Sequence, residues 1–106
     1  GSQGIYGSLD QTFLPSDLAI FQYSNSIPNN PINTYIGPTP NNTVCSSSST
    51  INDCFEASLD VQYITAIGIG VPTTYFYDPG NDYDFINFVT NVSNLANPNN
   101  VYSISY

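Results

Sequence analysis

Two carboxylates four positions apart, Glu56 and Asp60, are the residues of this sequence whose type and spacing best suit chemistry. They lie in the run EASLDVQY (residues 56–63), which is predicted to be part of an amphipathic helix. Residues at i and i+4 share a helix face, with Cβ atoms roughly 5–6 Å apart, so two like charges there repel. Such a pair can share a proton, or one carboxylate can orient the other while it acts as a general base. The structural alternative is that Glu56 only caps a helix and Asp60 is a solvated surface acid.

The helix that carries this pair is predicted over residues 53–67. Asp53 is expected to cap it, with Glu56 three residues later as in a capping box. The Gly- and Pro-containing residues 68–72 end it. Apolar side chains recur at helical spacing and define the expected apolar face: Phe55, Leu59, Tyr63 and Ala66.

The residues after this helix predict a strand at 73–77, a turn at 78–81, a helix at 82–94 and a strand at 101–106. Helix, strand, helix, strand is the pattern of parallel βαβ units. Two parallel strands are not stable alone, because both faces of a parallel sheet must be covered. The order therefore indicates a piece of a larger α/β domain.

The first half of the chain is less regular. The glycine-rich residues 1–7 are predicted to be a loop. A short helix is expected to start at Pro15-Ser16-Asp17, with Ser16 as its N-cap and with Leu18, Phe21 and Ile20 facing a core. Residues 25–52 are rich in Pro, Asn and Ser and predict an irregular stretch with one strand near 33–36. The whole chain, residues 1–106, is short enough to be a single segment of at most one domain.

Charge composition excludes several functions. The chain has eight Asp and Glu, no Lys, Arg or His, and a net charge of −8. Without a cation to neutralise phosphate, nucleic-acid binding is not expected, and an anionic membrane surface should repel the chain. Without His, a Ser-His-Asp or Cys-His site within this chain is excluded. No metal or cofactor site is predicted in it.

Two cysteines and two sequons bear on the compartment. Cys45 and Cys54 are the only cysteines, and they form either a short disulfide loop or two reduced thiols in the cytosol. Asn41 and Asn91 begin Asn-x-Ser/Thr sequons, and are candidate sites for N-linked glycans. Together these features favour a secreted, extracellular or lysosomal protein. No apolar run approaches the roughly 18 residues of a membrane span.

The octapeptide at 56–63 resembles the Glu-x-x-x-Asp helix of the sedolisins, the serine-carboxyl peptidases, and most closely their tripeptidyl-peptidase branch. Weaker likeness extends to residues 13–21, 73–77, 84–88 and 101–106. The resemblance implies a subtilisin-like α/β fold and a Ser-Glu-Asp triad that works at acidic pH. Glu56 would be the general base, and Asp60 would hydrogen-bond to Glu56 and hold it in place.

The chain also departs from the family. The nucleophilic serine of the family lies in a Gly-Thr-Ser-x-Ser motif, which this sequence lacks, and the downstream oxyanion aspartate and calcium site implied elsewhere in the parent are missing too. The serines at 46–49 form a low-complexity loop and do not replace the motif. The chain therefore carries two of three triad residues and is not expected to be an enzyme alone.

The expected fold class follows from these departures. Both ends fall where no domain boundary explains them, so an excised segment would leave strand edges exposed. Identical copies could pair with those edges in register, since Asn, Tyr and Phe are abundant and Lys is absent. We therefore expect an all-β, cross-β (amyloid-like) filament layer of stacked identical chains, with a structural role. The alternative is an α/β, βαβ fragment of a subtilisin-like parallel-sheet domain, part of an active acid peptidase.

Overall fold

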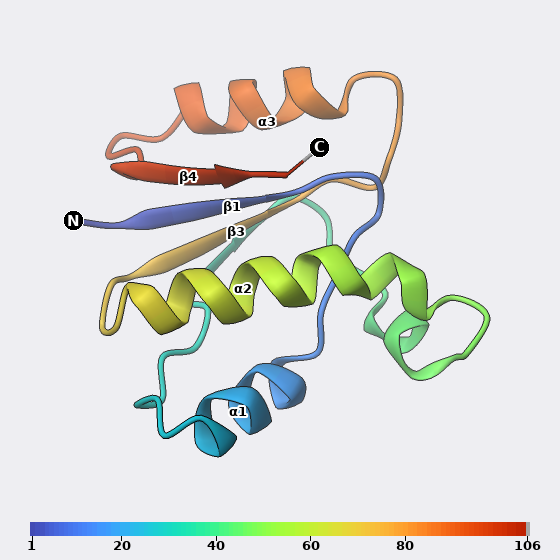
Figure 1. Cartoon of the computed structure of the whole chain (residues 1–106). Helices are drawn as coiled ribbons and strands as arrows, with labels where there is room; N and C mark the ends of the chain where they lie inside the picture. The colour runs from blue at the N-terminus through green and yellow to red at the C-terminus, as the bar shows by residue number, and fades with distance from the viewer. Residues whose placement is uncertain (106) are drawn as a thin grey trace.

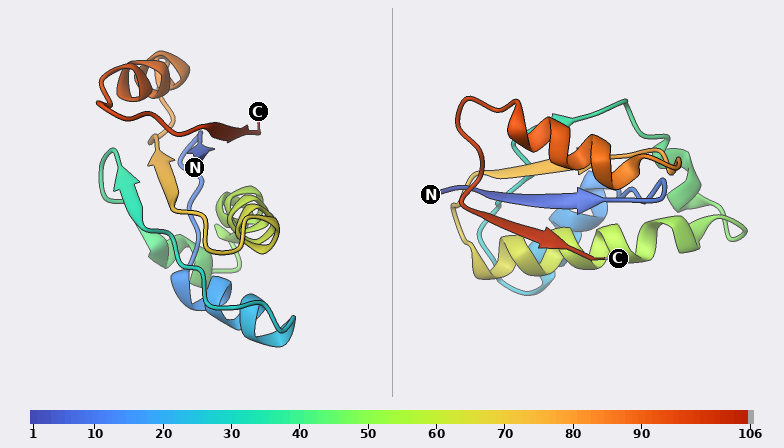
Figure 2. Two further views of the ribbon diagram at one scale, coloured as in Figure 1. Left: turned by 90° about the vertical axis from the view of Figure 1, so that its left-hand side faces the viewer. Right: turned by 90° about the horizontal axis from the view of Figure 1, so that it is seen from above.

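The computed structural model describes residues 1–105 and shows an α/β fold with three layers. A parallel sheet of four strands has the order β2-β3-β1-β4. Helix α3 covers one face, and helices α1 and α2 cover the other (Figures 1 and 2). The elements along the chain are β1 (Gln3–Gly7), α1 (Pro15–Ser24), β2 (Thr34–Ile36), the 3-10 helices η1 (Asn42–Ser46) and η2 (Ile51–Cys54), α2 (Phe55–Ile67), β3 (Thr73–Tyr77), α3 (Asp84–Ser93) and β4 (Val101–Ile104).

The expectation of an all-β, cross-β layer is wrong, and the structure matches the βαβ alternative. Strands β1 and β3 find their partners within the chain, in parallel register from Gln3 opposite Thr73 to Gly7 opposite Tyr77. Residues 55–67 and 84–93 stay helical because each buries side chains against this sheet. Tertiary packing therefore agrees with the local helix preference instead of overriding it.

Strand β1 is one of the two inner strands of the sheet, so the prediction that residues 1–7 are a loop is wrong. All five of its residues are buried. Its glycines are needed for close approach: a Cβ on Gly4 would lie 2.7 Å from the Tyr102 ring, and one on Gly7 would overlap the Tyr75 hydroxyl. The glycines that indicated a loop are thus the places where neighbouring tyrosines cross the strand.

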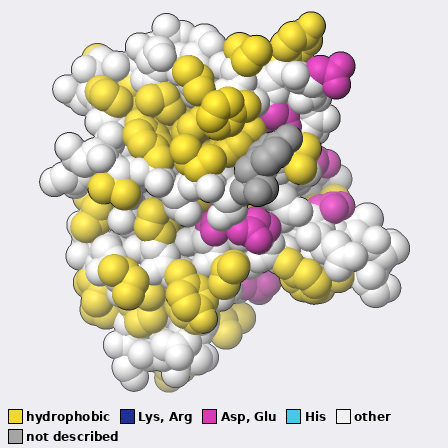
Figure 3. Space-filling view, turned by 45° about the horizontal axis from the view of Figure 1, so that its top comes forward, with side chains coloured by type: hydrophobic (Ala, Val, Ile, Leu, Met, Phe, Trp, Pro, Cys, Tyr) yellow, Lys and Arg dark blue, Asp and Glu magenta, His cyan; other side chains and the backbone are white. Residues whose placement is uncertain are grey.

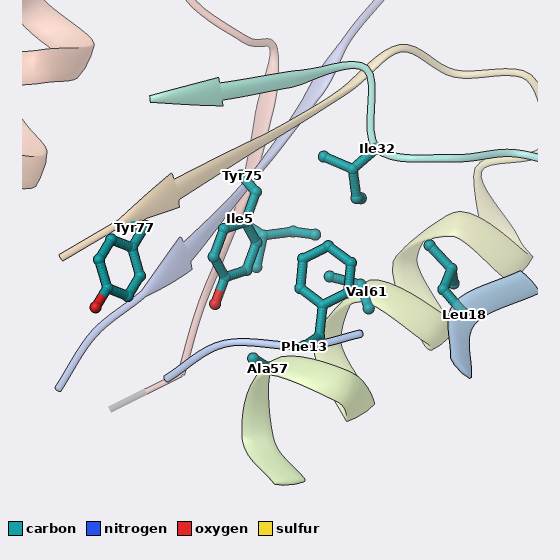
Figure 4. Close-up of a cluster of buried hydrophobic side chains, with 8 residues drawn as sticks. All are labelled: Ile5, Phe13, Leu18, Ile32, Ala57, Val61, Tyr75 and Tyr77. Carbon is teal, nitrogen blue, oxygen red and sulfur yellow. The ribbon is translucent and has the colours of Figure 1, made fainter. Parts of the chain in front are cut away.

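The two faces of the sheet have separate cores. On the face of α1 and α2, eight residues form one cluster (Figure 4): Ile5, Phe13, Leu18, Ile32, Ala57, Val61, Tyr75 and Tyr77. On the face of α3, Phe88 stacks on Tyr6 with ring centroids 4.5 Å apart and meets Phe76 edge-on at 5.3 Å. Leu18 faces the core as predicted, whereas Ile20 is 62% exposed and Phe21 is only partly buried. The predicted cap is wrong too, because Pro15 is the first residue of α1 and Leu14, not Ser16, is its N-cap.

Helix α2 buries a different face from the predicted one. Ala57, Val61 and Thr65 lie against the sheet, whereas Phe55, Leu59 and Tyr63 are 59%, 49% and 61% exposed. The predicted cap is also wrong, because residue 53 lies within η2 and no side chain caps α2. Small buried residues let α2 pack closely on the sheet, which fixes the position of the carboxylates on its first two turns.

Candidate active site

The carboxyl ends of the parallel strands form the edge that bears the candidate site. Ser8, Asp78 and Ser105 directly follow β1, β3 and β4. Open α/β sheets bind ligands at this edge, outside the carboxyl ends of their strands. Helix α2 begins near the same edge, so both Glu56 and Asp60 reach it.

Asp60 is the more enclosed member of the predicted pair. It is half-buried, and the Ser105 hydroxyl donates a hydrogen bond of 3.1 Å to its Oδ1. Burial raises the pKa of Asp60 to about 6; the Ser105 hydrogen bond opposes this, while the charge of Glu56 and a side-chain hydrogen bond to Glu56 add to it. A protonated Asp60 can donate that bond, which is the proton-sharing arrangement expected from the spacing.

Glu56 is exposed and faces a shallow depression of about 480 Å³. Ser8, Leu9, Gln11 and Ser105 line the rest of it. Asp60 lines a neighbouring depression instead, beyond Ser105. The structure therefore brings the two carboxyl groups together and gives them different surroundings: Glu56 is open to a ligand, and Asp60 lies behind it.

The rim of this depression is a strained turn after β1. Leu9 and Asp10 both have positive φ angles, 54° and 62°, and the Gln11 N–H donates to the Ser8 carbonyl at 3.0 Å. Left-handed backbone costs a residue with a side chain roughly 1–2 kcal/mol. The surroundings enforce it: the Asp10 N–H donates to the Asp78 carbonyl at 3.0 Å, and the Tyr77 hydroxyl donates to the Asp10 carboxylate.

A second acidic pair, Asp78 and Asp84, was missed by the sequence analysis. Both are buried, at 4% and 5% exposure. The N–H groups of Leu9 and Asn81 donate to Asp84 at 3.2 and 2.5 Å. Although burial opposes it, these bonds and one from Asp78 lower the pKa of Asp84, while burial and Asp84 raise the pKa of Asp78 to about 6. Acids on both sides of a Pro-Gly turn before a helix were the signal for this pair.

The acidic side chains gather on one half of the face that Figure 3 shows, among hydrophobic side chains. Within residues 1–105, no three Asp, Glu, Cys or His side chains converge in a way that could hold a metal ion. In the same part of the chain, none of the helices has the length and apolar character to cross a membrane.

The predicted disulfide between Cys45 and Cys54 is confirmed, with Cα atoms 5.6 Å apart. It joins η1 to the end of η2, just before α2. The Thr12 N–H donates to the Asp53 carbonyl at 3.0 Å and ties this loop to the segment after β1. The disulfide thus secures the entry to the helix that carries Glu56.

The two sequons lie in different surroundings. Asn41 is exposed and precedes η1, where its Oδ1 accepts hydrogen bonds from the backbone and hydroxyl of Thr43. Asn91 is half-buried on α3 and lines a depression with Tyr77 and Asp78. Their glycosylation remains a prediction at this point.

Fold and site together define a class: a parallel α/β sheet with an accessible carboxylate and a partly buried partner at the carboxyl edge. Among known proteins, the chain is 33% identical to tripeptidyl-peptidase 1 of Dictyostelium discoideum over 108 residues, 99% of this chain. That match supports a sedolisin-like segment. The chain spans only 16% of this relative's length. No family model matches it, and no solved structure does.

Proposed function

We propose that this chain supplies the general base and its orienting acid to a serine-carboxyl peptidase. Glu56 accepts the proton of a serine hydroxyl, and Asp60 holds Glu56 in position. The serine belongs to a part of the peptidase outside this sequence, which lacks the family's nucleophile motif. The similarity to a tripeptidyl-peptidase supports the assignment, and peptides are the substrate class.

The observation that carries the proposal is the unequal environment of the two carboxyl groups. Asp60, with its pKa raised to about 6, keeps a proton at acidic pH and donates it in a hydrogen bond to Glu56. Glu56 keeps its remaining oxygen for the depression shared with Ser8 and Ser105. One group is therefore the fixed donor and the other is the free acceptor, which is the division of roles that base catalysis requires.

Acidic conditions suit this pair better than neutral ones. As the pH rises through about 6, Asp60 ionises and stops donating, and two like charges then face each other on α2. At acidic pH an imidazole base would be protonated, whereas a carboxylate still accepts a proton. We accordingly propose an acidic compartment on the secretory route, lysosomal or extracellular, which the Cys45–Cys54 disulfide supports.

The test is peptide hydrolysis by the complete peptidase that contains this chain. Glu56→Gln keeps the size of the side chain and removes the base, so kcat should fall by about 10²–10⁴-fold. Asp17→Asn, which removes an exposed carboxylate on α1, is the matched control and should leave kcat unchanged. Equal loss in both variants, or activity retained in Glu56→Gln, would show that Glu56 is not the base.

The filament role is not retained. It depended on a cross-β layer of identical chains, and the parallel sheet of the folded chain replaces that layer.

A further inference from the structure

Asn41 has the geometry of a side chain that can carry a sugar without losing its structural role. Its Oδ1 caps η1 by accepting from the Thr43 N–H at 3.3 Å and from the Thr43 hydroxyl at 2.7 Å. Within the described residues, no hydrogen bond is made by its Nδ2, the atom to which a glycan is attached. The neighbouring Asn42 is fixed by a hydrogen bond of 2.5 Å from the Thr12 hydroxyl. Hydrogen bonds therefore hold this loop, while the Asn41 side chain is exposed.

Asn91 differs in each of these respects. It is half-buried at the eighth position of α3 and shares a depression with Tyr77 and Asp78. The Ser93 hydroxyl, the third member of its sequon, donates to the Val89 carbonyl at 2.8 Å. A sugar on Asn91 would have to enter the space between α3 and the end of β3.

A shallow trough of about 420 Å³ begins beside Asn41. Its lining includes Pro40 and Asn42, the two chain neighbours of Asn41, and the apolar side chains of Tyr35, Pro38 and Pro15. Tyr35 lies on β2, an edge strand that pairs with β3 on one side. Its side chain is 49% exposed. Its ring stacks on Phe13 with centroids 6.2 Å apart, so it presents a fixed aromatic surface next to the sequon.

We propose that Asn41, and not Asn91, is N-glycosylated, and that the first sugar covers the Tyr35 trough along the edge of β2. The donor is a lipid-pyrophosphate-linked oligosaccharide of the secretory route. A bond forms between Asn41 Nδ2 and C1 of the first N-acetylglucosamine as the bond from C1 to the pyrophosphate oxygen breaks. Nδ2 loses one proton, and the lipid pyrophosphate leaves. This goes beyond the proposed peptidase function and does not depend on it.

Coverage of β2 gives the glycan a physical role. An edge strand leaves backbone N–H and C=O groups unpaired, and proteins commonly protect such edges with charged side chains, especially Lys. This chain has no Lys. A sugar over the trough would block the approach of another strand by its bulk, in place of the charge that Lys side chains provide at other edges.

Occupancy is tested on the full chain secreted from eukaryotic cells. Peptide-N-glycosidase digestion in heavy-oxygen water converts a glycosylated Asn to labelled Asp, which peptide mass spectrometry locates. We expect the label at Asn41 and none at Asn91. Thr43→Ala should abolish the label, and Thr43→Ser, which preserves the sequon, should restore it. An unlabelled Asn41, or a label at Asn91, in the folded and secreted chain would overturn the assignment.

Coverage of the edge is tested by hydrogen exchange of residues 34–40 in the glycosylated chain and in Asn41→Asp. Aspartate keeps the Oδ1 cap and cannot be glycosylated, so this variant separates the cap from the sugar. We expect these amides to exchange severalfold faster in Asn41→Asp, with residues 3–7 of the inner strand β1 unchanged as an internal control. Equal exchange at 34–40 in both proteins would show that the sugar points away from the trough.

Discussion

Two acidic pairs lie at the same edge of the sheet in opposite surroundings. Asp78 and Asp84 are buried, and two backbone N–H groups donate to Asp84. Glu56 is exposed, and Asp60 is half-buried with a single hydroxyl donor. Because backbone donors occupy both oxygens of Asp84 and both side chains are buried, this pair can fasten loops but is not open to a ligand. The open pair keeps the capacity to accept a proton from a ligand, so position and donors distinguish the structural pair from the pair that we propose to be catalytic.

The sharpest test of this contrast is the stability of Asp84→Ala. The change leaves the Leu9 and Asn81 N–H groups without their acceptor and should lower the free energy of unfolding by about 3 kcal/mol. Urea denaturation followed by circular dichroism measures it. Asp82→Ala, an exposed acid two positions away, should stay within about 0.5 kcal/mol of the parent. Equal urea midpoints for the two variants would show that Asp84 does not fasten these loops.

The pH dependence of stability tests the protonated member of each pair. The pKa values of Asp78 and Asp60, both about 6 in the folded chain, lie above the ordinary 3.8. Their contribution to stability is therefore complete below about pH 3.8 and is lost as the pH rises through about 6. Asp78→Asn should flatten the fall in Tm between pH 4 and pH 7 by roughly 5 °C, and the less buried Asp60→Asn should flatten it less.

Calorimetric scans at a series of pH values measure these slopes. Asp17→Asn serves as a control for the general repulsion among eight acidic residues, because it removes one exposed charge and no buried carboxyl group. The interpretation fails if Asp17→Asn flattens the slope as much as Asp78→Asn.

Ser105→Ala should raise the pKa of Asp60 in the open pair. The Ser105 hydroxyl stabilises the charged form of Asp60, so its removal raises the pKa of that carboxyl further. The alkaline limb of peptidase activity should shift upward by at most about one pH unit. Ser103→Ala, beside the neighbouring depression, should leave the limb in place. A shift to lower pH would contradict the protonated role of Asp60.

The smallest expected effect concerns the turn that joins the two pairs. Leu9 has a positive φ of 54°, is 58% exposed, and donates its N–H to Asp84. Leu9→Gly should relieve the left-handed strain and raise the stability by about 0.5 kcal/mol after the extra entropy of glycine is subtracted. Ile69→Gly, at a similar exposure of 54% and without a positive φ, should lower it. Chemical denaturation of both variants decides the sign.

The sequence predicted what local pattern encodes. Spacing alone identified Glu56 and Asp60 as neighbours, and periodicity placed the strand at 73–77 and the helix around Phe88. Prediction from the sequence failed where contacts between distant residues decide the local structure. Glycines made β1 look like a loop, because the tyrosines that cross it lie far along the chain.

The prediction of the buried face of α2 was wrong for a related reason. Apolar side chains lie on more than one side of this helix, so size, not hydrophobicity, selects Ala57 and Val61 for the sheet. Asp78 and Asp84 meet only once the turn after β3 has formed, and the acids on both sides of its Pro-Gly sequence were the local signal of that contact. The cross-β expectation failed because it assigned to other chains the edges that β1 and β3 satisfy with each other.

The strand order has a consequence for synthesis. β1 leaves the ribosome first, yet its neighbours β3 and β4 are the last strands to be made. Strand β1 therefore meets these two partners only after residues 73–104 have been made, and sheets built from such distant contacts fold slowly. During that interval the glycines of β1 make the strand a poor template for aggregation.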